Sequence, residues 1–141
     1  MKKILLLFAL LLATASAIAL QDTPIASQAV GTGVTVSSTD QVSRTIDRTM
    51  HVILSPTAVT GAATATIAVD GRGPLGTYYN ILTSAATALV ANTPVVLKVG
   101  IGLTPTANVV ANDMVPPVYR ITVLVGGAGT TATFSVSRSI N

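Results

Sequence analysis

One pattern in the sequence binds phosphates in other proteins. Residues 69–80 are VDGRGPLGTYYN, in which Gly71, Gly73 and Gly76 satisfy G-x-G-x-x-G. In a dinucleotide site this loop leads into a helix whose free N–H groups face the pyrophosphate. Here the next residues, TYYNIL, favour a strand, and Pro74 removes a backbone donor from the loop. We therefore interpret the glycines as a turn between two strands and predict no nucleotide cofactor.

Other groups with catalytic potential are few and scattered. His51 is the only histidine, it lies in the strand-like segment MHVIL, and the sequence has no G-x-S-x-G elbow for a serine nucleophile. The sequence lacks cysteine and glutamate, and its five aspartates show no D-x-D spacing for calcium. We predict no enzymatic activity, no cofactor and no metal site. A secreted hydrolase that uses His51 with a serine and an aspartate is kept as an alternative.

The N-terminus has the pattern of a secretory signal peptide. Two lysines precede the apolar run ILLLFALLLA, and A-x-A sites follow that end at Ala17 and Ala19. The run is short for a membrane span, which needs about 20 residues. If residues 4–20 act as one apolar stretch, an uncleaved membrane anchor is the alternative. We assign residues 1–19 to a signal-like or anchor segment, and a membrane partner follows only if that segment is retained.

The basic character of the chain comes largely from this leader. The formal charge is +3, and without the two leader lysines six basic residues face five aspartates, which leaves +1. The chain after the leader therefore has no basic patch that could displace many counterions from a phosphate backbone. Nucleic acid is therefore not an expected partner.

The rest of the chain has the composition of a β protein. Short runs rich in Val, Thr and Ile are separated by Gly, Pro, Asn and Ser, and no long helical period is present. Several runs alternate apolar and polar residues, which indicates one buried and one solvated face. We predict a single antiparallel β-sandwich of about seven or eight strands over residues 34–141. The predicted strands are residues 34–38, 50–54, 63–69, 77–82, 94–100, 119–125 and 132–137.

The segments before and between the predicted strands can also be interpreted. Residues 20–33 are predicted to form an extended arm, and Ser55-Pro56 is expected to end the second strand. Residues 103–117 are the longest segment without a predicted strand. Residues 126–130, GGAGT, are expected to join the last two strands as a hairpin loop.

Four residues are candidates for contacts with a partner. Tyr78 and Tyr79 alternate across their strand, so we expect one in the core and the other, for which we choose Tyr79, as a surface anchor. Arg120 is either a solvated position with an aspartate partner or a contact toward another subunit. Asn108 and Asp113 lie in the long connection, where their side chains suit local turns. The candidate interface is therefore Tyr79, Asn108, Asp113 and Arg120.

Three segments together resemble small β-sandwich virion proteins of tailed bacteriophages. They are GTYYNIL (76–82), LKVGIGLTPTANVVANDMVPPVYRITV (97–123) and TFSVS (133–137), and the similarity covers about residues 64–137. The positions that match the pattern of that group are Gly76, Thr77, Tyr78, Tyr79, Gly102, Leu103, Thr104, Ala107, Asn108, Pro116, Tyr119, Arg120, Phe134, Ser135 and Val136.

This resemblance implies a structural protein without catalytic residues. The expected role is a head-decoration or minor capsid subunit in the virion, with other virion proteins or further copies of itself as partners. The leader departs from that expectation, because phage heads assemble in the cytoplasm. An exported bacterial binding module, periplasmic or at the cell surface, is therefore the alternative from a different class.

Overall fold

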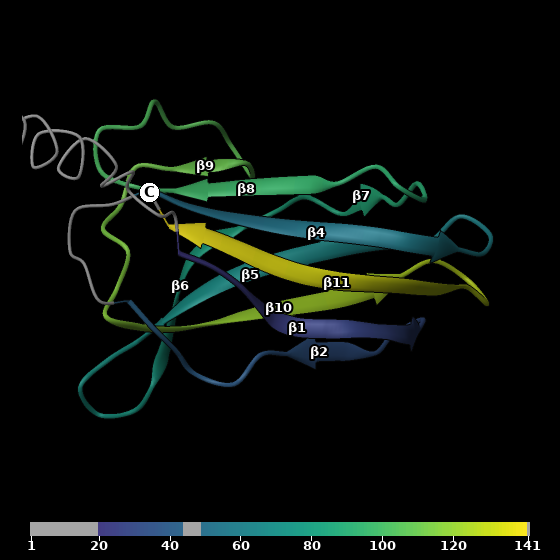
Figure 1. The fold of residues 1–141 in the computed structure, drawn as a ribbon, viewed down its shortest axis with the longest axis horizontal. Helices are drawn as coiled ribbons and strands as arrows, with labels where there is room; N and C mark the ends of the chain where they lie inside the picture. The colour runs from purple at the N-terminus through teal and green to yellow at the C-terminus, as the bar shows by residue number, and fades with distance from the viewer. Residues whose placement is uncertain (1–19, 44–48, 141) are drawn as a thin grey trace, which may run out of the picture.

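Eleven strands form two sheets over residues 20–43 and 49–140, which the computed structural model describes (Figure 1). The leader predicted for residues 1–19 lies outside the described residues. The first sheet has the order β1 (Leu20–Gly31), β11 (Thr131–Ile140), β4 (Met50–Val59), β8 (Val95–Val99) and β9 (Val110–Ala111). The second sheet has the order β2 (Thr35–Ser37), β10 (Val118–Gly126), β5 (Thr64–Arg72) and β6 (Tyr78–Thr83), with β3 (Gln41–Val42) beside β10 and β7 (Thr87–Ala88) beside β5.

The predicted alternation of buried and solvated positions is confirmed in the long strands. Their inward residues form one aliphatic core between the sheets, and each buried Val, Leu or Ile contributes roughly 1.5–3 kcal/mol. The buried members include Ala63, Ala65, Ile67, Val69, Leu97, Val99, Tyr119, Ile121, Val123, Val125, Phe134 and Val136. The all-β sandwich predicted from the sequence is therefore correct at the level of fold class.

The number of strands and their uniform antiparallel pairing were predicted wrongly. Eleven strands are present in the described residues rather than seven or eight, and β9 lies within the 103–117 connection and pairs parallel to β8. The added strands β3, β7 and β9 have two residues each. A two-residue pairing has no periodicity for sequence reasoning to detect.

Strand β4 continues through Ser55-Pro56, where the sequence predicted its end. Proline lacks the N–H that a ladder needs. Pro56 lies opposite Phe134, at the point where the register of β4 with β11 shifts between Thr133 and Phe134. This irregularity accommodates the missing donor, and the strand then runs on to Val59.

The connection at residues 126–130 is not a hairpin. Strand β10 belongs to the second sheet and β11 to the first, so the loop crosses between sheets. Two of its glycines have positive φ, 102° at Gly127 and 61° at Gly129, which lets the chain change layers. Thr130 is buried in this loop and shares a hydrogen bond with Thr32.

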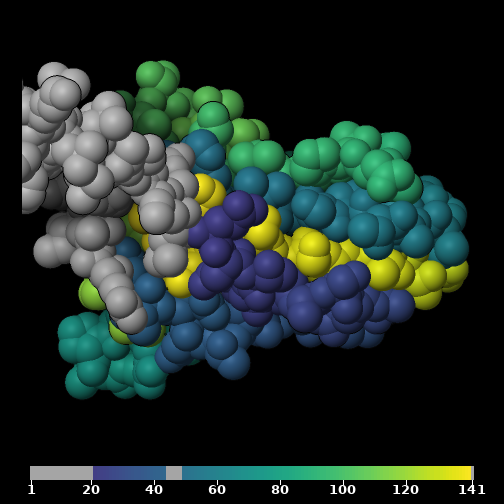
Figure 2. Space-filling view, in the orientation of Figure 1, coloured from purple at the N-terminus to yellow at the C-terminus, as the bar shows by residue number. Residues whose placement is uncertain are grey.

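The extended backbone predicted for residues 20–33 is present, but it does not stand apart as an arm. Leu20–Gly31 forms β1, an edge strand that pairs antiparallel with β11 and buries Ile25 and Val30. Figure 2 shows this face of the molecule, with β11 lying between β1 and β4.

Candidate functional site

The glycine-rich segment is a hairpin loop, as the sequence analysis predicted. It connects β5 to its antiparallel neighbour β6, and the Gly73 N–H donates to the Thr77 carbonyl over 2.8 Å. Gly76 has a φ of 78°, a conformation that glycine adopts without a steric penalty. In Figure 1 this loop lies at the lower left of the molecule.

An open pocket of about 500 Å³ lies beside this hairpin loop. Tyr79 contributes an aromatic side chain that is 51% exposed. An added Cβ at Gly71 would lie 2.6 Å from the Tyr79 ring, so the ring packs directly on the glycine backbone. The lining residues are Arg72, Gly73, Pro74, Gly76, Tyr79, Pro117 and Val118.

Neither of the paired tyrosines lies in the core, contrary to the expectation for one of them. Tyr78 is 36% exposed, and its hydroxyl donates to Asp40, which raises the pKa of Tyr78. Arg72 also binds Asp40, with Nη1 at 2.6 Å from Oδ2. β6 is an edge strand whose one neighbour in the sheet is β5, its register against β5 shifts between Val69 and Asp70, and its first three residues are exposed.

Arg120 has its partners within the chain. Its Nε lies 3.4 Å from Asp70 Oδ2, and its guanidinium lies 3.8 Å from the centroid of the Tyr78 ring. Asp70 also accepts a hydrogen bond from Asn80 on β6. These contacts link the solvated faces of β10, β5 and β6, and they give Arg120 the aspartate partner expected in the first of its two interpretations, while its role as a subunit contact stays a prediction.

Asn108 and Asp113 flank a strand of the first sheet, and Tyr79 and Arg120 belong to the second. That strand is β9, at the edge of the first sheet, whereas Tyr79 lies on β6 and Arg120 on β10. Asn108 has a φ of 61°, and Asp113 accepts a hydrogen bond from the Met114 N–H at 2.7 Å. Both residues shape turns, as their types predicted.

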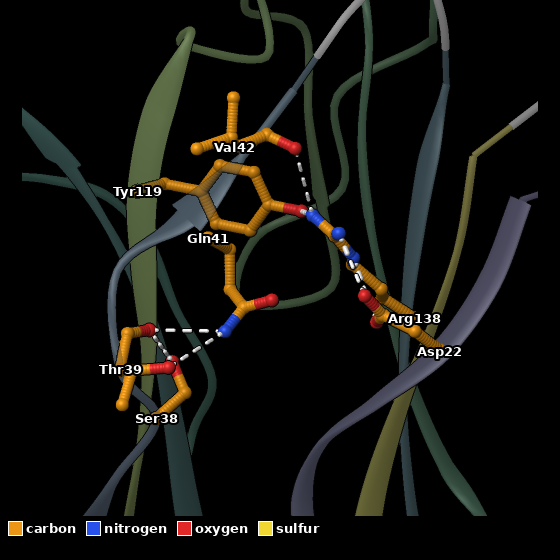
Figure 3. A network of polar contacts seen from close by, with 7 residues as sticks. All are labelled: Asp22, Ser38, Thr39, Gln41, Val42, Tyr119 and Arg138. Carbon is orange, nitrogen blue, oxygen red and sulfur yellow. Dashed lines mark hydrogen bonds and ion pairs between the residues drawn. The ribbon is translucent and has the colours of Figure 1, made fainter.

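A buried polar network that the sequence analysis missed joins the two sheets (Figure 3). Arg138 on β11 is 5% exposed, and its Nε and Nη2 donate to the two carboxylate oxygens of Asp22 at 2.8 and 2.7 Å. Its Nη1 donates to the Tyr119 hydroxyl and to the Val42 carbonyl. Burial raises the pKa of Tyr119, and the hydrogen bond from Arg138 partly opposes that shift.

A signal for this network was present in the sequence. In the predicted strand 132–137, Phe134 and Val136 alternate with Thr133 and Ser135, and Arg138 continues this alternation two residues beyond Val136. The predicted strand ended at Ser137, one residue too early to include it. The partner Asp22, 116 residues away in sequence, could not be inferred in the same manner.

His51 lies on β4, and among the described residues its neighbours in the sheet come from β11 and β8. Its cross-strand partners are Ser139 on β11 and Lys98 on β8 rather than a carboxylate. Partial burial and the charge of Lys98 lower its pKa. In the part of the chain that the structure describes, no three His, Cys, Asp or Glu side chains gather to hold a metal ion. Across the same residues, no helix has the length and apolar character to cross a membrane.

Comparison with known proteins finds a similar fold in a viral protein of known structure. No protein-family model and no curated protein matches the chain. Among solved structures, the crystal structure of the infectious bursal disease virus VP2 subviral particle matches with a TM-score of 0.53 at 12% identity. The structure of the Gx strain of the same virus matches with a TM-score of 0.52 at 12% identity. Each match covers 86% of this chain and 31% of the other, so the chain spans about a third of their length.

At this level of identity the likeness defines a class of fold. The chain is a two-sheet β-sandwich of the kind found in a viral capsid protein. The more specific resemblance to tailed-bacteriophage decoration proteins stays a prediction.

Proposed function

We propose that this protein is a structural subunit of a virion, an accessory or decoration protein that docks on a capsid or tail lattice. The observation that carries the proposal is the match of 86% of the chain to the sandwich of the VP2 subviral particle. The resemblance of residues 76–82, 97–123 and 133–137 to tailed-phage virion proteins supports the same role.

The distribution of charge agrees with a role in docking. Each arginine of the described residues is bound to an aspartate: Arg72 to Asp40, Arg120 to Asp70 and Arg138 to Asp22. Carboxylates held in this manner do not meet as the pair that acid–base catalysis uses.

When many copies dock on one lattice, each single contact can have a low affinity. On a repeating lattice, binding of linked copies is governed by effective concentration, so individually weak interfaces suffice. The candidate contact surfaces are the exposed edge of β1, the turns around Asn108 and Asp113, the exposed Tyr79 ring on β6, and the solvated face of β10 at Arg120.

The proposal is tested by quantitative mass spectrometry of density-purified particles produced by cells that express the chain. We expect the chain to co-purify at a fixed ratio to the major capsid or tail protein, and to remain bound after a wash that removes a non-virion protein of equal abundance. Recovery only in the cell envelope, as a shorter form cleaved after Ala17 or Ala19, would instead support the exported binding module and defeat the virion role.

A further inference from the structure

Among the residues that the structure describes, the most exposed large apolar side chain belongs to the 73–77 hairpin loop. Leu75 is 93% exposed. The loop that carries it is constrained, because Gly73 donates to Thr77, Gly76 donates to Gly73 and Pro74 fixes its own φ. Leu75 is therefore held in solvent by its backbone, and it does not pack back on the sheet.

A single exposed leucine needs no explanation by itself. Leu75, however, lies between Pro74 and Gly76, which both line the pocket described above. The other lining groups include the Tyr79 ring, Pro117 and Val118, so the lining is mainly apolar. Its volume of about 500 Å³ is enough for an aliphatic side chain. An apolar protrusion and an apolar recess thus lie side by side on one hairpin.

We propose that this surface binds a second copy of the chain, with Leu75 of each copy in the pocket of the other. A two-fold interface requires one patch that is complementary to itself, and a protrusion beside a recess meets that requirement. The nearest charges, Arg72 and Asp40, are bound to each other, so two copies meet without an unpaired like charge.

A contact limited to one hairpin loop and the pocket beside it is small, because stable complexes bury roughly 1,200–2,000 Å². It is therefore a weak dimer in solution that repetition on a lattice would strengthen. The inference deepens the proposed function, but its test uses the purified full chain alone. Failure of self-association leaves the virion role standing, and failure of the virion role leaves self-association measurable.

Cysteine cross-linking tests the contact, because the chain has no native cysteine. The variants Leu75→Cys and Pro117→Cys are mixed and treated with a short bismaleimide. We expect at least fivefold more mixed cross-linked dimer than in a mixture of Leu75→Cys with Leu124→Cys. Leu124 is a matched control, because it is 43% exposed on the solvated face of β10. Equal yields in the two mixtures would overturn the proposal.

A second measurement does not depend on the reach of the cross-linker. Leu75→Asp should weaken the self-association constant from analytical ultracentrifugation at least tenfold, because each carboxylate would face an apolar pocket. Leu124→Asp should leave that constant unchanged. Both positions are exposed, so both variants should fold, and their thermal unfolding midpoints should stay close to that of the wild-type chain. Wild-type chain that stays monomeric at the highest soluble concentration, or equal effects of the two aspartates, would refute the two-fold contact.

Discussion

Removal of Asp22 should destabilise the sandwich more than its place on an edge strand suggests. The carboxylate receives two charge-assisted hydrogen bonds from Arg138, whose side chain is 6% exposed. Hydrogen bonds to charged groups contribute about 1.5–3 kcal/mol each to stability. A guanidinium that stays buried without its carboxylate adds the free-energy cost of an uncompensated buried charge. The Asp22 side chain is 40% exposed, and Arg138 keeps Tyr119 and Val42 as partners, which reduces the loss. We therefore expect Asp22→Ala to cost about 2–3 kcal/mol.

Urea unfolding of a double-mutant cycle measures the interaction. The variants are Asp22→Ala, Arg138→Met and the pair together, in the full chain. For a domain of this size the dependence of the free energy of unfolding on urea concentration is about 1–3 kcal/mol per M, so a loss of about 2–3 kcal/mol in Asp22→Ala should lower the urea midpoint by about 0.7–3 M. The coupling free energy between the two positions should be about 1.5–3 kcal/mol.

The exposed pair of Arg72 and Asp40 provides a matched control. Its N···O distance of 2.6 Å is as short as that of the buried pair, but its side chains are 45% and 32% exposed. Solvated pairs contribute about 0.2–1 kcal/mol. If the two cycles give equal coupling, burial does not set the strength of the Asp22–Arg138 pair, and the reasoning is refuted.

Three further predictions concern single positions. The free energy of unfolding should fall as pH rises above about 10, because the pKa of Tyr119 is raised and the native state keeps a proton that the unfolded chain releases. In urea titrations at several pH values, Tyr119→Phe should make the free energy of unfolding fall less steeply with pH. An unchanged dependence on pH would contradict the role of Tyr119. Gly127→Ala should cost more than about 2 kcal/mol, because φ is +102° and the new Cβ would lie 2.6 Å from the Ala62 carbonyl oxygen. Gly31→Ala, with no atom within 4 Å of its Cβ, should change stability by less than about 0.5 kcal/mol, and similar losses at both glycines would disprove the steric argument. Ser84→Ala should cost about 1–3 kcal/mol, because the buried Ser84 hydroxyl accepts from the Ile67 N–H at 2.9 Å; amide exchange at Ile67 should accelerate, and a protected amide would argue against it.

The fold class was predictable wherever local pattern and tertiary burial coincide. In Ile67, Val69, Ile121 and Val123, β-branched residues alternate at the period of a strand and are fully buried. The glycine-rich loop was also predictable, because Pro74 and the strand-forming residues after it exclude a helix N-terminus.

The wrong predictions, the end of a strand at Ser55-Pro56 and a hairpin at residues 126–130, depend on which strand lies beside the segment. Pro56 is tolerated in β4 only because the pairing with β11 shifts beside it, and no local signal announces that register. The glycines at 126–130 suit a hairpin and a crossing between sheets equally well, and the choice depends on which sheet receives β11. For the candidate site, the exposure of Tyr79 was expected, whereas the approach of Pro117 and Val118 to the hairpin loop is a property of the assembled sheet.

The paired charges of the described residues agree with the docking role proposed above. The three arginines of the described residues are each bound to an aspartate, which leaves Lys98 and Asp113 as opposite charges outside those pairs. Asp113 is engaged by the Met114 amide, and Lys98 lies beside His51. Because most charges of the described residues are paired, the docking contact proposed above would rely on hydroxyls, small side chains and a few exposed apolar residues. Contacts of this kind vary little with ionic strength, because screening acts on unpaired charge, and they gain strength by repetition.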